Sequence, residues 1–297
     1  DSSGSYASAF YNCSNLKKIA LPEGLTALTE NAFYGCSKLE QLHIPSTVAR
    51  IGRSAFYNCK ALTHAALPEG VTEIPQHAFY GCSALASVDI PSTVTTIVGY
   101  SFQNCAALKD VTLPDGLTAI GAYAFSGCKA LESIAIPSKV TTIENHAFYQ
   151  CANLKTATFS EGLVSLQDDV FYQCVLLEDV TFPASLETIG ARTFGGCNSF
   201  TKISINIEDI HEYSFWNCTG LTAIELGDKV KSIGRNAFIS NGGNAVASIT
   251  CHAATPPVLG SSAFGSVGGT VAGKKYVYVP AESFDAYEKE WAVLTNT

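Results

Sequence analysis

Apolar residues recur along this chain in a pattern that repeats every 23 residues. In a representative copy, Leu131, Ile134 and Ile136 give an LxxLxL spacing, and Phe148 and Cys151 follow later in the same repeat. Alternation within the last four positions of LxxLxL is typical of a β-strand with one buried face. About eleven copies keep this register, so the whole chain is expected to repeat one structural unit.

A single 23-residue coil cannot bury the apolar face of its own strand, whereas stacked coils bury it jointly. A repeat length between about 20 and 29 residues is typical of leucine-rich repeats. We therefore predict a right-handed leucine-rich repeat solenoid with a parallel β-sheet on its concave side. A second apolar pair, Val48 and Ile51 in one repeat, predicts short turns or strands on the convex side.

The pattern divides the chain into three parts. Residues 1–8 read as an N-terminal tail, 9–254 as a solenoid of about eleven coils, and 255–297 as a C-terminal capping segment. A final strand is expected at Tyr276–Pro280, followed by a helix with Ser283 as its N-cap. That helix would bury one face, formed by Phe284, Tyr287, Trp291 and Leu294. No comparable cap precedes the first coil, so we expect further chain upstream in the native protein.

Cysteine occupies one position in each repeat. Metal and disulfide frameworks use clustered or paired cysteines, whereas even spacing favours a small buried side chain at a tight point of each coil. Cα atoms of adjacent coils would be close enough for a disulfide, but side chains that point in parallel oppose the required dihedral angle. We predict a structural ladder of reduced thiols, formed by Cys13, Cys36, Cys59, Cys82, Cys105, Cys128, Cys151, Cys174, Cys197 and Cys218.

An aromatic residue directly follows the repeat phenylalanine in most copies. On a helical turn this position lies about 200° from the inward alanine, so the side chain is expected to face outward. Exposed aromatic rings can bind sugars or anchor a protein partner, but neighbouring rings could equally cover one another and shield the turn. The candidate binding stripe comprises Tyr11, Tyr34, Tyr57, Tyr80, Tyr149, Tyr172 and Trp216.

The charge pattern narrows the classes of partner. The net charge is −8, only 15% of residues are charged and no basic run occurs, which argues against nucleic acid and anionic membranes as partners. No apolar stretch reaches the ~18 residues needed to span a bilayer, so membrane insertion of this segment is not expected.

The same sequence offers no candidate chemistry. The six histidines are scattered without metal-ligand spacing. The stretch GGTVAGKK at 268–275 lacks both the hydroxyl residue and the following helix of a phosphate-binding loop. We predict no catalytic residues, no metal site and no cofactor, and therefore a protein that is not an enzyme.

The repeat signature LxxIxIPxxVxxIGxxAFxxC, seen from Leu131 to Cys151, resembles the BspA-like (treponemal-type) leucine-rich repeat family. The C-terminal TPP at 255–257, YVP at 278–280 and the Tyr287 and Trp291 tail are also similar to that family's usual ending. The resemblance implies a secreted or bacterial cell-surface protein that takes part in adhesion, and it implies no catalytic residues. Proline is missing at Ser160, Asn206 and Gly227, which affects local turns only.

Two functions remain open from the sequence. The first is a non-catalytic module for adhesion or for protein or glycan binding, whose partner would be an unidentified host matrix protein, cell-surface protein or glycan. The second is a structural spacer within a larger surface protein. Mixed, mostly small residues on the outward face of the predicted sheet mark no binding hot spot.

Overall fold

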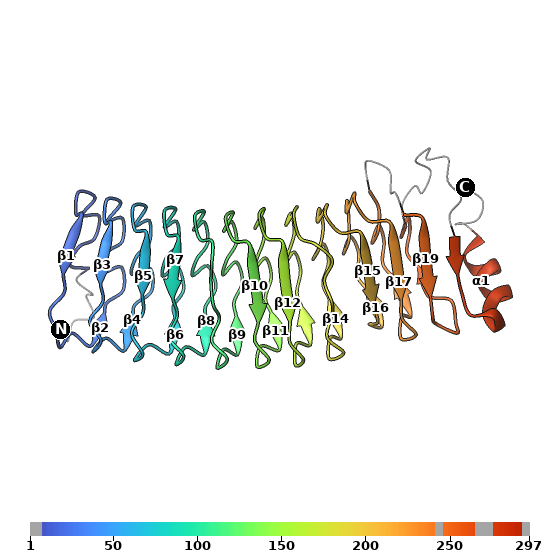
Figure 1. Cartoon of the computed structure of the whole chain (residues 1–297), viewed down its shortest axis with the longest axis horizontal. Helices are drawn as coiled ribbons and strands as arrows, with labels where there is room; N and C mark the ends of the chain where they lie inside the picture. The colour runs from blue at the N-terminus through green and yellow to red at the C-terminus, as the bar shows by residue number, and fades with distance from the viewer. Residues whose placement is uncertain (1–7, 241–245, 265–275, 293–297) are drawn as a thin grey trace.

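The computed structural model describes residues 8–240, 246–264 and 276–292. The GGTVAGKK stretch and Leu294 lie outside the described residues. Figure 1 shows coils stacked side by side in an almost straight row, with the N-terminus at one end and the helix α1 at the other. The chain is therefore a leucine-rich repeat solenoid with little helix, as the 23-residue period predicts.

One row of parallel strands follows the LxxLxL positions. Its strands pair from coil to coil one repeat apart, as in Lys18 with Gln41, and the row is hydrogen-bonded in three pairs and one group of four. Two coils lack a strand in this row, those of Asp110 and Asp179, and Asp110 makes only a single bridge, to Ser87. The row comprises β1 (Lys18–Ala20), β3 (Gln41–His43), β5 (His64–Ala66), β7 (Ser87–Asp89), β10 (Ser133–Ile136), β12 (Thr156–Phe159), β15 (Lys202–Ile205), β17 (Ala223–Leu226), β19 (Ser248–Cys251) and β21 (Tyr276–Tyr278).

A second row of two-residue strands lies on the return path of the coils. Nine of them form the longest continuous sheet among the described residues, from β6 to β20. Each strand in the middle of this row buries one aliphatic side chain, such as Ile74 or Ile97, against the core. The row comprises β2 (Ala27–Leu28), β4 (Arg50–Ile51), β6 (Glu73–Ile74), β8 (Thr96–Ile97), β9 (Ala119–Ile120), β11 (Thr142–Ile143), β13 (Ser165–Leu166), β14 (Thr188–Ile189), β16 (Asp209–Ile210), β18 (Ser232–Ile233) and β20 (Val258–Leu259).

The interior contains an uninterrupted column of phenylalanine rings, one from each coil. Consecutive rings are nearly parallel, with centroids 5.0–5.7 Å apart. Such spacing lets each ring pack against both neighbours, which excludes water from the core. The column comprises Phe10, Phe33, Phe56, Phe79, Phe102, Phe125, Phe148, Phe171, Phe194, Phe215, Phe238 and Phe264.

The cysteine thiols lie beside this column and take part in its hydrogen bonding. The Cys36 thiol donates to the carbonyl oxygen of Phe10 in the preceding coil, at 3.0 Å, and the same contact recurs up to Cys218 at 3.0–3.3 Å. A carbonyl such as that of Phe33 thus accepts both the backbone N–H of Cys36 and a thiol from the next coil. Cysteine is therefore more than a small apolar filler, since it also supplies a donor.

Cys13 differs from the other members of the thiol ladder because its side chain is exposed. It belongs to the first described coil, so no earlier described coil covers it. Burial raises the pKa of the internal thiols, to about 12 for Cys151, and keeps them protonated at neutral pH. Cys13 therefore corrects the expectation that every thiol of the ladder is buried.

The last strand, a short 3-10 helix η1 (Ala281–Ser283) and α1 (Phe284–Glu290) cover the C-terminal end of the core. Tyr287 and Trp291 are buried there, and the Trp291 ring lies 5.8 Å from that of Phe264, the last ring of the interior column. The Trp291 indole N–H donates to the carbonyl of Pro257 at 3.0 Å. The C-terminal segment therefore closes the solenoid with both apolar and polar contacts.

One expectation about this cap was wrong, and another holds only for the position of the residue. Phe284 is 56% exposed, because only the Tyr287 and Trp291 side of α1 rests on the last coil. Ser283 is the N-cap residue of α1, as expected, but its side chain makes no capping hydrogen bond. Its hydroxyl donates instead to the carbonyl of Ala254 at 2.7 Å, which ties the helix to the solenoid.

Candidate functional site

The first four tyrosines of the predicted stripe stack on one another at the surface. Ring centroids lie 4.9 Å apart between Tyr11 and Tyr34, 4.5 Å between Tyr34 and Tyr57, and 4.6 Å between Tyr57 and Tyr80. Tyr11, at the end, is 50% exposed, and the other three are partly buried. Because the rings cover one another's faces, they present mainly edges and hydroxyl groups to solvent.

The C-terminal part of the stripe also stacks. Tyr149 and Tyr172 lie 5.3 Å apart, and the rings of Tyr172 and Trp216 are parallel at 6.3 Å although a whole coil separates them. Gly195 occupies the stripe position of that intervening coil. A Cβ atom there would lie 2.8 Å from Cδ2 of Tyr172, so glycine is what allows the Tyr172 ring to lie over this coil.

The stripe lacks aromatic residues at Gln103 and Ser126, and a neighbouring column that the sequence analysis missed bridges this gap. The column lies three residues earlier in each repeat, and its members have left-handed backbone angles, with φ between 58° and 65°. Consecutive rings stack at 5.0, 4.9 and 4.4 Å. Its members are His77, Tyr100, Tyr123 and His146.

Both ends of this second column contact the stripe. His77 lies edge-on to Tyr80 at 5.7 Å, and His146 lies 5.3 Å from Tyr149. Unbroken ring contacts therefore run along one edge of the solenoid. We call this surface the aromatic ribbon, and it consists of Tyr11, Tyr34, Tyr57, Tyr80, His77, Tyr100, Tyr123, His146, Tyr149, Tyr172 and Trp216.

The electrostatics keep the ribbon uncharged at neutral pH. Burial, and then the neighbouring Tyr80 and Tyr34, raise the pKa of Tyr57. Burial also lowers the pKa of His77, with the nearby Arg53 cation as a second cause. A tyrosine with a raised pKa and a histidine with a lowered one are both neutral near pH 7. The ribbon therefore offers hydrogen bonds and apolar contact without net charge.

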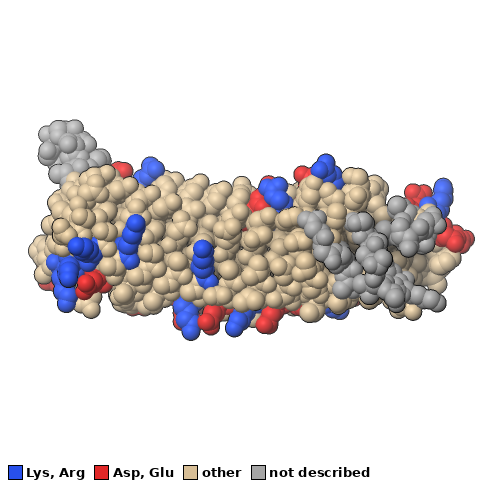
Figure 2. Space-filling model, turned by 90° about the horizontal axis from the view of Figure 1, so that it is seen from above, with Lys and Arg blue, Asp and Glu red and all other residues tan. Residues whose placement is uncertain are grey.

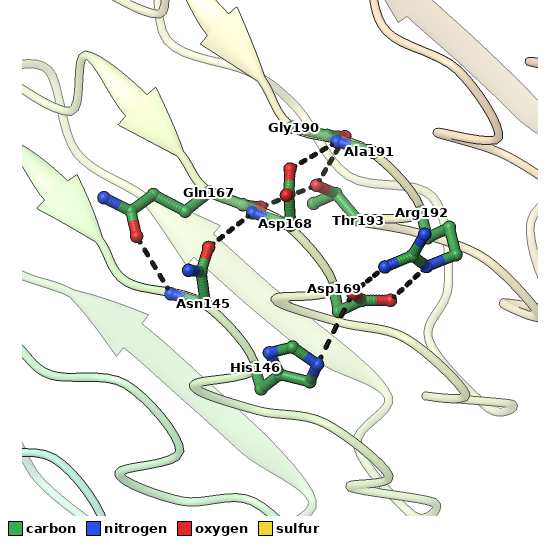
Figure 3. Close-up of polar contacts among 9 residues, drawn as sticks. All are labelled: Asn145, His146, Gln167, Asp168, Asp169, Gly190, Ala191, Arg192 and Thr193. Carbon is green, nitrogen blue, oxygen red and sulfur yellow. Dashed lines mark hydrogen bonds and ion pairs between the residues drawn. The ribbon is translucent and has the colours of Figure 1, made fainter.

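An ion pair follows the second column after His146 (Figure 3). The Asp169 carboxylate is buried and accepts two hydrogen bonds from Arg192, from Nε at 2.9 Å and from Nη2 at 2.7 Å. His146 Nε2 lies 3.4 Å from the same carboxylate. Burial lowers the pKa of His146 despite this neighbour. The forked geometry satisfies Asp169 and marks a structural ion pair.

Polar side chains beside this ion pair join successive coils (Figure 3). The backbone N–H of Asn145 donates to Gln167 Oε1 at 3.1 Å, and the backbone N–H of Asp168 donates to Asn145 Oδ1 at 3.0 Å. The backbone N–H of Ala191 donates to Asp168 Oδ1 at 2.8 Å. The polar atoms of these side chains are thus engaged in hydrogen bonds between successive coils. They offer no preorganised nucleophile or acid–base pair of the kind that a reaction needs.

The described residues form neither a metal-ligand cluster nor a membrane-spanning helix. No three His, Cys, Asp or Glu side chains there converge into a group that could hold a metal ion. None of the helices in these ranges has the length and hydropathy that crossing a membrane requires.

The outer face of the first strand row carries a shallow groove near the N-terminal end. Its volume is about 820 Å³, and its rim includes Lys18, His43 and His64. His64 is already engaged, with Nδ1 2.9 Å from the Ser87 hydroxyl and Nε2 3.4 Å from the Asp89 carboxylate. The groove is open and has a mixed lining of apolar and polar side chains, and His64 is already bonded within it, so it is a weaker candidate than the ribbon.

Charged residues are sparse on the surface. On the face seen in Figure 2, lysine, arginine, aspartate and glutamate occur singly or in small groups, and other residues form most of the area. On this face the distribution offers no large field of one sign that could attract a polyelectrolyte.

Comparison with known proteins agrees with the geometry. Residues 5–132 and 118–245 match the profile of the BspA type leucine rich repeat region (6 copies). Among solved structures, a leucine-rich repeat protein from Bacteroides ovatus is 26% identical, with a TM-score of 0.57 over 82% of this chain and 75% of that one. A leucine rich cell surface protein from Faecalibacterium prausnitzii is 28% identical, with a TM-score of 0.51 over 81% and 74%.

A third solved structure, the leucine-rich repeat protein of T. pallidum, is 30% identical, with a TM-score of 0.50 over 59% of this chain and 78% of that one. No curated protein sequence gives a significant match. The similar structures share the repeat architecture, and none of their names states a ligand or a reaction.

Proposed function

This chain belongs to the BspA-type leucine-rich repeat family, and from that premise we propose that it is a binding module of a bacterial cell surface that attaches to a protein partner along the aromatic ribbon. The F. prausnitzii protein to which it is similar is described as a cell surface protein, which supports this location. The observation that carries the proposal is the unbroken series of ring contacts from Tyr11 to Trp216.

The shape and chemistry of the ribbon favour a protein partner. Nine coil steps at ~4.8 Å give a strip roughly 40 Å long, comparable with one dimension of a standard protein interface. Tyrosine and tryptophan are the residues that most often dominate binding energy in such interfaces. The ring faces are covered by their neighbours, so the exposed edges and hydroxyl groups are better placed to contact peptide groups than to stack on sugar rings.

A binding role also fits the absence of a reactive constellation among the described residues. His146 Nδ1 is buried and has no hydrogen-bond partner there. The adjacent Asp169 carboxylate is held by Arg192. A general base needs a substrate proton within hydrogen-bond reach, and neither group presents itself to solvent in that way. We therefore propose a non-catalytic protein.

The test uses the whole chain in reducing buffer, exposed to an array of extracellular matrix proteins. The informative variant is Tyr34→Ala with Tyr57→Ala, and the matched control is Gln103→Ala, which alters a non-aromatic stripe position. Saturable binding that the double variant loses and the control keeps would support the ribbon. Binding that survives in a folded double variant would place the site elsewhere and overturn the proposal.

Tyr34→Phe with Tyr57→Phe separates binding from stability, because this pair keeps the stacked rings and removes only the hydroxyl groups. Loss of binding with an unchanged melting temperature would assign the contact to the hydroxyls. Since the ribbon carries no net charge, its affinity should change little between low and physiological salt.

A spacer role is the second candidate, and the self-stacking of the ribbon favours it. Rings that cover one another stiffen the row of coils without needing a partner. Under this hypothesis, no array protein binds, and Tyr34→Ala with Tyr57→Ala changes only the stability.

A further inference from the structure

Exposed apolar side chains concentrate near the C-terminal end of the solenoid. Seven large apolar residues of the described chain are exposed, and five of them lie between residues 258 and 284. Two of these five, Tyr276 and Tyr278, are more than half exposed, at 53% and 55%. Single exposed apolar residues are common on protein surfaces, whereas a cluster of exposed apolar residues often marks a binding site.

Both tyrosines stand on the outer face of β21. This strand pairs in parallel with β19, so that Ser248 lies opposite Tyr276 and Thr250 lies opposite Tyr278. The two rings are 6.2 Å apart and inclined by 24°. The side chains opposite them on β19 are a serine and a threonine, which are much smaller than tyrosine. The two tyrosines therefore project beyond their neighbours at the end of the sheet face.

Tyr276 and Tyr278 differ from the ribbon tyrosines in how much of their surface neighbouring residues cover. Ribbon tyrosines are partly buried between neighbours on both sides, as Tyr57 is between Tyr34 and Tyr80 at 4.5 and 4.6 Å. Tyr276 and Tyr278 are more than half exposed as residues, and among the described residues each ring stacks only on the other, which leaves one ring face of each without a stacked neighbour there. Ring faces that are free in this way can pack against the C–H groups of a flat ligand.

Hydrogen-bonding groups lie on the neighbouring strands of the same face. Glu225 on β17 is in register with Thr250, which is in turn in register with Tyr278. The Glu225 carboxylate lies 3.0 Å from Nζ of Lys202 and 3.4 Å from Nε2 of His252. The cluster therefore combines a carboxylate, an ammonium, an imidazole and a hydroxyl, with the negative charge of Glu225 offset by Lys202.

We propose that Tyr276 and Tyr278, together with Glu225, Lys202, His252 and Thr250, form a binding site for a neutral saccharide. The apolar face of a pyranose ring would pack on the tyrosines, and its hydroxyl groups would exchange hydrogen bonds with the polar cluster. Because Lys202 offsets the charge of Glu225, the pair carries no net charge that would attract an anionic sugar. The assignment is independent of protein binding at the ribbon, which lies on a different set of residues.

The experiment measures saturation-transfer NMR on the whole chain with lactose, N-acetyllactosamine and cellotetraose as neutral probes. Sialyllactose and a heparin oligosaccharide serve as charged comparators. We expect saturation transfer to at least one neutral probe, and at least a tenfold loss of affinity in Tyr276→Ala with Tyr278→Ala. Absence of transfer to every neutral probe, or stronger binding of the charged comparators, would overturn the proposal.

Two variants guard against misreading a folding defect. Glu225→Gln keeps the shape of the cluster and removes a charge, so it should weaken saccharide binding while leaving the melting temperature nearly unchanged. Tyr34→Ala with Tyr57→Ala removes ribbon rings and should leave saccharide binding intact. Equal loss of saccharide binding in that ribbon variant, when it is folded, would contradict the placement of the site, whatever the fate of the proposed protein interface.

Discussion

The interior phenylalanine column and the aromatic ribbon are built from adjacent residues, such as Phe33 and Tyr34, yet they follow different rules. The interior column contributes one phenylalanine per coil without exception from Phe10 to Phe264. The ribbon changes column at His77 and His146 and crosses a glycine at Gly195.

The two columns differ because the space left by a missing ring is filled differently inside the solenoid and at its surface. Inside the solenoid, a missing ring leaves a cavity that neighbouring rings cannot close, so every coil must supply the same shape. At the surface, water fills the space or an adjacent side chain leans over it, as Tyr172 does over Gly195. A repeat protein can therefore vary its outer aromatic surface freely while its inner one stays fixed.

The largest effect is expected at alkaline pH, where the interior thiols should respond before the ribbon tyrosines, whose ordinary pKa of about 10 is higher. The pKa values of nine thiols from Cys36 to Cys218 are raised above the value of 9.0 for an unperturbed thiol, mainly by burial, and for Cys59 first by its hydrogen bond with Cys82 and then by burial. Below pH 9 both states are protonated and stability is retained, whereas above it only the unfolded chain ionises and stability falls. Each thiol should cost about 1.4 kcal/mol at pH 10, one unit above the unfolded pKa, or about 13 kcal/mol for all nine.

Denaturant unfolding in reducing buffer at pH 8, 9 and 10 measures this loss. Cys128→Ala should lower the stability at pH 8 and also reduce the dependence on pH. A free energy of unfolding that stays constant from pH 8 to pH 10 would contradict the burial of the thiols.

Phe125→Ala should give the next largest effect. Phe125 is fully buried between Phe102 and Phe148, at 5.2 and 5.3 Å. Truncation of such a ring costs about 3–5 kcal/mol, because it removes buried surface and leaves a cavity. Phe125→Leu should recover part of this loss, and equilibrium unfolding in urea compares the two. Equal stabilities of Phe125→Ala and wild type would disprove the comparison between interior and surface.

Tyr57→Ala should have a smaller effect on the same measurement. The variant loses two stacked contacts, each worth about 0.5–1.5 kcal/mol, so a loss of about 1–3 kcal/mol is expected. Tyr57→Phe keeps both contacts and should stay within about 0.5 kcal/mol of wild type. If Tyr57→Phe were as destabilising as Tyr57→Ala, the hydroxyl and not the stacked ring would hold the ribbon together.

The smallest effect is expected for Tyr276→Ala. The exposed ring has few contacts to lose, so stability should change by no more than about 0.5 kcal/mol. The same substitution should nevertheless weaken saccharide binding, since the free ring surface is what the ligand would cover. A large destabilisation would show that Tyr276 has a structural role like that of the ribbon tyrosines.

Much of the fold could be predicted from the sequence, because each coil repeats the same local pattern. The LxxLxL spacing predicted the strands, and the second apolar pair predicted the short return strands such as Arg50–Ile51. The resemblance to BspA-like repeats is confirmed by the family match. These features depend on which positions of a coil are apolar. The 23 residues of a single repeat are enough to specify those positions.

The remaining features depend on contacts between side chains of different coils. The 23-residue period alone does not specify these contacts. The ribbon continues through Tyr100 and Tyr123 because side chains from two columns meet in space. Aligning the residue three places before the stripe would have shown these aromatics, but not their contacts with the stripe.

The sequence by itself determined the repeat, its register and its inward face. Only the tertiary structure decided which rings stack, that thiols donate to carbonyl oxygens of the preceding coil, and that Phe284, Tyr276 and Tyr278 remain exposed. The physical reason is that periodicity fixes where each Cα lies in the stack, whereas packing between side chains of different coils fixes what each residue touches.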